Sequence, residues 1–147
     1  MSAAGDHGAA GRWEHFPHDA DIGVRGYGAT PEEAFAQAAL AMMAAILDPA
    51  TVRIEQTIDI VLEAPRLDLL LVDWLNALIY EMAERRMVFG AFEVKIEGHH
   101  LKGRALGEAV SRARHAPAVE AKGATYTELA CVEDRPGLWR AQCVIDV

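Results

Sequence analysis

Cysteine is scarce in this sequence, and long apolar runs are missing from it. The 147 residues include two cysteines, Cys131 and Cys143, whose spacing does not form a CxxC motif. Such a pair predicts buried free thiols in a reducing cytoplasm, rather than a disulfide across neighbouring strands. No apolar run approaches the roughly 20 residues that a transmembrane helix needs. We therefore expect a cytoplasmic protein that does not enter a membrane.

Positive charge is also in short supply. The chain has 14 Lys and Arg residues against 22 Asp and Glu residues, which gives a net charge of −8. Nucleic-acid phosphates need a dense basic surface, so this balance argues against direct nucleic-acid binding. It fits a protein that binds cations or docks on a basic partner. The sequence has no GxSxG, P-loop or GxGxxG motif, which removes the commonest signals of a hydrolase or a nucleotide-binding fold.

The first residues carry no targeting signal. Residues 1–11 are rich in alanine and glycine, and they have neither a basic start nor an apolar stretch. We expect a flexible N-terminal tail there, followed by one domain over residues 12–147. Apolar residues make up 52% of the chain, which is enough to bury a substantial core.

Two segments have the apolar period of an amphipathic helix. The first begins where Thr30 can cap the helix, Pro31 suits its first position and Glu33 completes a capping box. It ends before residues 48–49, an Asp-Pro pair. The second helix is expected over about residues 68–86.

Alternating apolar and polar residues predict strands around these helices. The expected strands cover residues 13–16, 21–27, 52–63, 92–97, 101–106, 119–132 and 138–147. Residues 107–117 are polar and irregular, and residues 134–137 read as a tight turn. Two main helices and six or seven mostly antiparallel strands predict an α+β fold, arranged as a two-layer sandwich.

One candidate site lies at the start of the strand expected over residues 21–27. His15, His18, Asp19 and Asp21 place two imidazoles and two carboxylates within seven residues. Asp19 and Asp21 can point the same way if the chain is extended. Carboxylate oxygens prefer hard cations such as Ca²⁺, Mg²⁺ or Mn²⁺, and histidine would shift the preference toward a transition metal. Asp and His also cap turns, so composition leaves that structural role open.

A second acidic group lies at the end of the sequence. Asp146 precedes Val147, whose α-carboxylate would add another negative charge to an apolar strand. The two charges repel, and a cation would relieve that repulsion, although a solvated chain end explains the same residues. Lys122, Tyr126, Arg140, Gln142 and Asp146 are all even-numbered. Whether they share a sheet face depends on the hairpin register, which the sequence leaves open.

Together these segments resemble the archease family over about residues 13–147. The segments that carry the resemblance are His18-Asp19-Ala20-Asp21-Ile22, Thr30-Pro31-Glu32-Glu33, Leu70-Leu71-Val72-Asp73-Trp74-Leu75-Asn76, Gly107-Glu108, His115, Lys122-Gly123-Ala124-Thr125-Tyr126 and Trp139-Arg140-Ala141-Gln142-Cys143-Val144-Ile145-Asp146. Two positions depart from the family pattern. Asp19 replaces the usual Thr and adds charge beside the candidate site, and Gly123 replaces the usual Ala.

The resemblance implies a non-catalytic accessory protein of an RtcB-type RNA ligase, which joins RNA ends using GTP and a divalent metal. Archeases promote guanylylation of the ligase histidine and support multiple turnover, in tRNA splicing or RNA repair. The family's metal-binding acids correspond to Asp21 and Asp146. His18, Asp19 and the Val147 carboxylate are expected as further contributors to this Ca²⁺, Mg²⁺ or Mn²⁺ site. Lys122 is expected to contact a phosphate or the partner.

Two other functions fit the same residues. A stand-alone metal-dependent phosphoester hydrolase would need an open coordination position and a general base. A chaperone or modulator of an RNA-modifying enzyme, such as a methyltransferase, would need neither. Turnover of a phosphoester by the protein alone would favour the hydrolase, and capture of a partner other than a ligase would favour the modulator.

Overall fold

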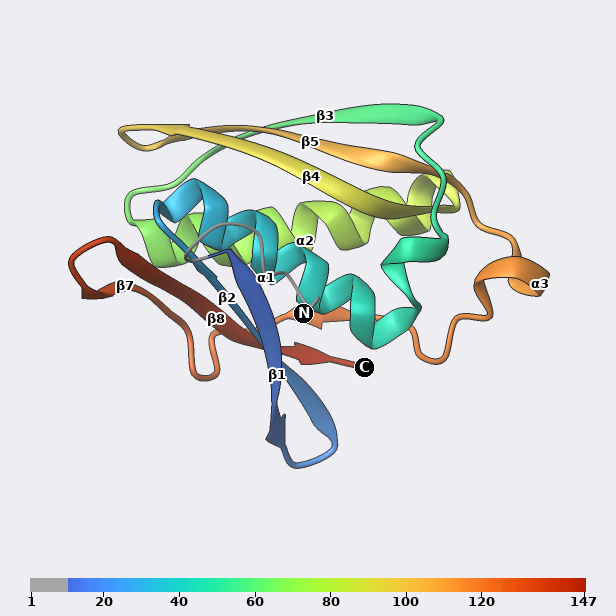
Figure 1. The fold of residues 1–147 in the computed structure, drawn as a ribbon, viewed down its shortest axis with the longest axis horizontal. Helices are drawn as coiled ribbons and strands as arrows, with labels where there is room; N and C mark the ends of the chain where they lie inside the picture. The colour runs from blue at the N-terminus through green and yellow to red at the C-terminus, as the bar shows by residue number, and fades with distance from the viewer. Residues whose placement is uncertain (1–10) are drawn as a thin grey trace.

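The computed structural model describes residues 11–147, which form eight strands and two long helices (Figure 1). The elements in chain order are β1 (Arg12–His18), β2 (Asp21–Gly28), α1 (Pro31–Ile46), the 3₁₀ turn η1 (Pro49–Thr51), β3 (Gln56–Glu63), α2 (Leu67–Arg85), β4 (Met87–Glu97), β5 (His100–Ala109), the one-turn helix α3 (Arg112–His115), β6 (Gly123–Ala124), β7 (Ala130–Arg135) and β8 (Leu138–Asp146). The predicted α+β class and its two main helices are confirmed. The flexible tail predicted over residues 1–11 lies outside the described residues except for Gly11, which is buried.

The described strands divide into two antiparallel sheets instead of joining one. The larger sheet has the order β1-β2-β8-β6, with β7 also paired to β8, and the smaller has the order β3-β5-β4. Both helices lie between the two sheets, so the molecule has a helical middle layer (Figure 1). The reason is visible in α1, which buries residues around most of its circumference, from Ala34 and Phe35 to Gln37 and Met43. A helix that buries side chains on opposite faces needs a packing partner on each face, and here each sheet supplies one.

The capping residues act much as the sequence predicts. The Thr30 hydroxyl accepts a hydrogen bond from the backbone N–H of Glu33 at 3.2 Å. The Glu33 carboxylate reaches back and accepts from the N–H of Ala29 at 2.6 Å, one residue before the capping threonine. Together these bonds satisfy two backbone donors near the start of α1. At the far end of α2, Arg86 takes a left-handed conformation with a φ of 54° and stops the helix.

The centre of the core is built around Trp74 of α2, which is fully buried. Its indole N–H donates to the carbonyl of Phe35 in α1 at 3.2 Å, which satisfies the ring's one polar atom. Its ring meets Phe92 of β4 edge-on, with centroids 6.0 Å apart. On the other side of α1, Gly26 of β2 faces the helix so closely that a Cβ there would clash with backbone atoms of α1. The core therefore depends on contacts to both sheets.

The strand predicted over residues 119–132 is wrong. Only β6 and β7 are extended within that range, and residues 125–129 between them form a loop. Glu128 in this loop has a φ of 55°, which is incompatible with a strand. The irregular segment predicted over residues 107–117 is partly wrong as well. There β5 continues to Ala109 and α3 forms one helical turn.

Helix α3 is held by a buried carboxylate, Glu108, which is 3% exposed. The Arg114 guanidinium binds both Glu108 oxygens, at 2.6 and 2.9 Å. The backbone N–H of Ser111 donates to Nδ1 of buried His115, so that nitrogen is an acceptor and the ring hydrogen is on Nε2. His115 Nε2 then donates to Glu108 at 2.9 Å. These bonds make the polar segment after β5 an ordered part of the fold.

We predict that these bonds make the protein sensitive to acid. The hydrogen bond from Arg114, with those from the Arg53 backbone and His115, holds the pKa of Glu108 well below its ordinary value of 4.5. A depressed folded-state pKa adds stability above the unfolded value and loses it as pH falls through the folded value. Unfolding in urea at neutral pH and below pH 4.5 should show that Glu108→Gln is destabilised at neutral pH and loses less stability on acidification than wild type. Glu97→Gln, an exposed carboxylate on β4, should behave like wild type, and equal acid sensitivity of Glu108→Gln would contradict the prediction.

Both cysteines are free, as predicted. Cys143 lies in the buried core and Cys131 is partly buried. Burial raises the pKa of each thiol to about 12. Because the thiolate is the reactive form, neither side chain is prepared for nucleophilic chemistry. Within residues 11–147, no helix is both long enough and apolar enough to cross a membrane.

Candidate functional site

The two predicted acids meet because β2 and β8 are neighbours in the larger sheet. The last residues paired between these strands are Ile22 and Ile145. Asp21 and Asp146 each lie one residue further on, so the same register places them opposite one another. Residues near the two ends of the described chain are thus brought to one corner of the sheet (Figure 1). The juxtaposition on which the predicted metal site depends is present.

His18 extends this pair into a row across three strands. It is paired with Asp21 between β1 and β2. Opposite residues in antiparallel strands project to the same face, so His18, Asp21 and Asp146 share one face. That face points away from the helices, because the alternate residue Ile145 is buried in the core. We call it the outer face of the larger sheet.

The His18 ring has an unsatisfied nitrogen. Among the described residues, His18 Nδ1 is one of two buried side-chain nitrogen or oxygen atoms without a hydrogen-bond partner; the other is Gln37 Oε1. A buried imidazole nitrogen without a partner costs free energy. A cation or a partner group at this corner could satisfy it.

Asp19 and Val147 lie beside the row. Asp19 is exposed in the turn between β1 and β2 and has a φ of 51°, so the expectation of an extended chain through Asp19 and Asp21 is wrong. Aspartate tolerates this left-handed conformation better than most residues. Val147 directly follows Asp146 and packs partly against the core. Their roles as metal ligands stay predictions.

Lys122 reaches the same corner through its backbone. Its N–H donates to the carbonyl of Asp146 at 2.7 Å, just before β6 begins. The side chain is exposed. The register that the sequence could not supply is therefore set by β6, which pairs Gly123 with Asp146. That pairing gives Gly123, and not Lys122, the sheet face of Asp146, so Lys122 is joined to the acidic pair by its backbone and its side chain is not placed on their face.

The donor set at this corner suits a hard cation only in part. Two aspartate carboxylates supply anionic oxygens, which Ca²⁺, Mg²⁺ and Mn²⁺ prefer, and His18 adds one nitrogen. Within residues 11–147, no group of three or more His, Cys, Asp or Glu side chains is gathered closely enough to hold a metal ion. His18, Asp21 and Asp146 therefore share a face without forming a three-ligand set, and a metal held at this corner would need further ligands from water or from a partner.

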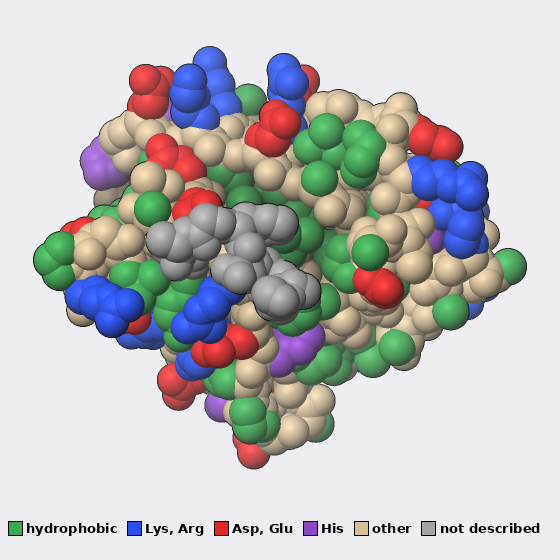
Figure 2. Space-filling view, viewed as in Figure 1, with side chains coloured by type: hydrophobic (Ala, Val, Ile, Leu, Met, Phe, Trp, Pro, Cys, Tyr) green, Lys and Arg blue, Asp and Glu red, His purple; other side chains and the backbone are tan. Residues whose placement is uncertain are grey.

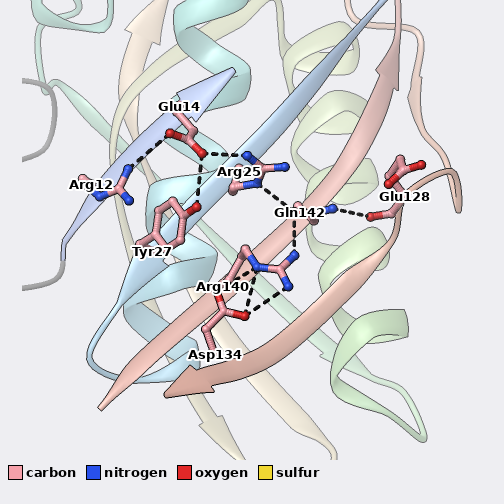
Figure 3. Close-up of polar contacts among 8 residues, drawn as sticks. All are labelled: Arg12, Glu14, Arg25, Tyr27, Glu128, Asp134, Arg140 and Gln142. Carbon is pink, nitrogen blue, oxygen red and sulfur yellow. Dashed lines mark hydrogen bonds and ion pairs between the residues drawn. The ribbon is translucent and has the colours of Figure 1, made fainter. Parts of the chain in front are cut away.

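A polar network on the same outer face includes Arg140 and Gln142, whose shared parity was noted from the sequence, but its links to Arg25, Glu14 and Asp134 were not predicted (Figure 3). Arg25 of β2 bridges β1 and β8, donating to Glu14 and to the Gln142 side-chain oxygen, both at 2.7 Å. Arg140 also donates to Gln142 at 2.7 Å, and it pairs with Asp134 of β7 at 2.9 Å. The Arg140 hydrogen bond keeps the pKa of Asp134 below its usual value. The only sequence signal for this network in β2 was the alternation that places Asp21 and Arg25 on the polar face of the strand.

This network gives the candidate site a rigid neighbour. The Arg25 guanidinium lies over the Phe16 ring at 4.5 Å, and that ring covers Gly23, where a Cβ would clash with it. Hydrogen bonds and ion pairs between side chains of the outer face thus connect β1, β2, β8 and β7. Strands connected by such side-chain pairs keep their register, which fixes the positions of Asp21 and Asp146 relative to one another.

The other sheet has a different surface character. Lys and Arg side chains alternate with Asp and Glu over its outer side, along the upper edge of Figure 2. Arg104 of β5 forms exposed ion pairs there with Asp59 and Glu93, at 3.6 and 3.9 Å. Such pairs contribute little stability, but they offset one another's charge. The acidic corner of the larger sheet is therefore the more distinctive electrostatic feature.

Comparison with known proteins points to one family. A family model described as the Archease protein family matches residues 13–147. The chain is 40% identical over 140 residues to Protein archease of Pyrococcus furiosus, which covers 92% of this chain and 99% of the relative. It is 38% identical over 141 residues to Protein archease of Methanosarcina mazei, with coverage of 92% and 96%.

Solved structures agree with the fold. The solution structure of protein 1598 from Methanobacterium thermoautotrophicum superposes with a TM-score of 0.81 at 31% identity, covering 92% of this chain and 98% of the other. A crystal structure of an archease from Thermotoga maritima, described as a possible chaperone, gives a TM-score of 0.62 and covers 91% of this chain and 96% of that one. At 18% identity, the second likeness shows the fold alone.

Proposed function

Since the chain belongs to the archease family, we propose that it is a non-catalytic accessory protein that activates an RtcB-type RNA ligase. An accessory role agrees with a sequence that contains neither the GxSxG motif of a nucleophile elbow nor the glycine-rich P-loop or GxGxxG motif of a nucleotide site. It also suits the description of a structural relative as a possible chaperone. The partner would be the enzyme, and this protein would promote guanylylation of the ligase histidine and repeated turnover.

The single observation that supports this role best is the meeting of Asp21 and Asp146 across β2 and β8. A metal at this corner would be held by these two carboxylates, with His18 beside them. When bound, a divalent metal supplies positive charge that neutralises negative charge on phosphates. The protein's own part is to hold the two carboxylates on a firm sheet, and to leave other coordination positions for the partner.

Docking would follow from charge. The net charge of −8 favours a basic partner surface, and a ligase that grips RNA must have one. Lys122, whose backbone N–H donates to the Asp146 carbonyl and whose side chain is exposed, supplies the one basic side chain of the predicted site. It would contact a phosphate or an acidic group of the ligase at the edge of that surface.

A guanylylation assay of the cognate ligase tests this proposal. We expect the protein to raise the rate at which GTP labels the ligase, and to do so in the presence of Mg²⁺, Mn²⁺ or Ca²⁺. Ligase alone with each metal is the control. An unchanged labelling rate in every metal would overturn the proposal. Hydrolysis of a phosphoester by this protein without ligase would support the stand-alone hydrolase instead.

A further inference from the structure

The Asn76 side chain of α2 forms two hydrogen bonds with the backbone of β6, on an edge of β6 where none of the described strands pairs. Its side-chain oxygen accepts from the backbone N–H of Ala124 at 2.8 Å, and its side-chain nitrogen donates to the Ala124 carbonyl at 3.2 Å. One amide thus occupies both backbone groups of a single residue, as a neighbouring strand would. The contact joins the helical layer to β6, on the edge of that strand that faces away from β8.

Strand β6 in turn holds the end of β8. Its two residues pair with Asp146 and Ile145. The N–H of Lys122 donates to the Asp146 carbonyl at 2.7 Å. Just beyond, the N–H and the hydroxyl of Thr125 both donate to the Val144 carbonyl, at 3.0 and 2.9 Å. Residues 144–146, at the end of β8, are therefore bonded along one edge by residues 122–125.

A two-residue strand cannot keep this position by itself. The chain is irregular on both sides of β6, over residues 116–122 and 125–129. Short strands with few ladder bonds are only marginally stable. Ala124 packs partly against the core, and the two hydrogen bonds from Asn76 add a directed link from β6 to α2, the helix that carries Trp74 in the core.

We propose that Asn76 is a positioning residue that aligns the Asp146 carboxylate with Asp21. The proposal rests on the proposed function, because it takes the acidic pair to be a metal site. Asn76 does not reach that site itself. It acts through Ala124 and the pairing of Gly123 with Asp146. Without the amide, β6 loosens, the end of β8 frays, and the two carboxylates lose their fixed separation.

The test measures Ca²⁺ affinity of the full chain by titration calorimetry. Loss of a residue that orients a metal ligand typically costs about 10- to 100-fold in affinity, so Asn76→Ala should bind Ca²⁺ about tenfold more weakly than wild type. Asn76 is exposed on a helix, where alanine favours folding. Asn76→Gln keeps a donor and an acceptor and should recover most of the affinity. Tyr80→Ala, at a position 61% exposed and one turn further along α2, is the matched control and should bind as wild type.

A second measurement separates positioning from general destabilisation. Amide hydrogen exchange should speed up in Asn76→Ala at Ala124, Ile145 and Asp146, while amides of β3 to β5 stay protected. If Asn76→Ala binds Ca²⁺ like wild type, or leaves exchange at those three amides unchanged, the role given to Asn76 is wrong and the metal site stands. If wild type binds none of Ca²⁺, Mg²⁺ and Mn²⁺, the metal site itself is wrong and this inference is overturned with it.

Discussion

Replacing Asp21 or Asp146 with asparagine is expected to abolish metal binding and ligase stimulation while the protein stays folded. Asparagine keeps the size of the side chain and one oxygen, but it removes the negative charge that attracts a hard cation. Since loss of an outer partner alone costs 10- to 100-fold, loss of a ligand should weaken Ca²⁺ binding by about 100-fold or more. Calorimetric titration and the guanylylation assay measure the two effects.

The same variants should show a second effect of opposite sign. Without metal, two like charges placed opposite one another on adjacent strands destabilise a sheet by about 0.2–1 kcal/mol. Either substitution should therefore leave the metal-free protein as stable as wild type or slightly more stable. Asp59→Asn, on the outer face of the smaller sheet, is the matched control and should retain full Ca²⁺ binding and stimulation. A variant of Asp21 or Asp146 that stimulates the ligase at the wild-type rate would show that the site is wrongly assigned.

Gly26→Ala should cause the largest loss of stability among the glycine substitutions considered. A Cβ at this position would overlap the carbonyl of Ala34 and the N–H of Ala38, so α1 would have to move off β2. Overpacking of this kind costs about 3 kcal/mol, which is a large part of the 5–15 kcal/mol that stabilises a typical domain. For a chain of this length the melting temperature should fall by about 6–12 °C. Thermal unfolding followed by circular dichroism measures it.

Gly123→Ala provides the matched comparison for that experiment. A Cβ there would meet one atom, the side-chain oxygen of Asn76, at an ordinary contact distance of 3.7 Å. The substitution should leave the melting temperature within about 2 °C of wild type, in keeping with the small effect of most surface changes. An equal loss in both variants would mean that close packing of α1 on β2 is not the cause.

The local elements were predictable because their signals are local. The capping box at Thr30 and Glu33 formed nearly as expected, and β2 matches its alternating pattern to within one residue. The partition into two sheets was not predictable, because periodicity shows that a helix has an apolar side but not how many layers cover it. The strand predicted over residues 119–132 was wrong for a related reason. Within that range β6 has only two residues, and one of its edges is bonded by the Asn76 side chain instead of by a strand, which an alternating pattern does not reveal.

The candidate site shows the same limit. Asp21 and Asp146 were weak signals taken separately, since each lies at the end of an ordinary strand. Only the family resemblance joined them before the register of Ile22 with Ile145 was known. The Arg25 network was missed because its partners come from three other strands, and strand order is a long-range property.

The place of β8 in the larger sheet has a consequence for biosynthesis. The smaller sheet and α2 come from one continuous stretch, residues 56–109, and can form as soon as that stretch leaves the ribosome. The larger sheet must wait, because β2 pairs with β8, the last strand of the described chain. Until then β2 keeps a bare edge that invites aggregation, and long-range pairing of this kind folds slowly. The nascent chain therefore passes through a stage in which residues 56–109 have left the ribosome and the acidic pair does not yet exist.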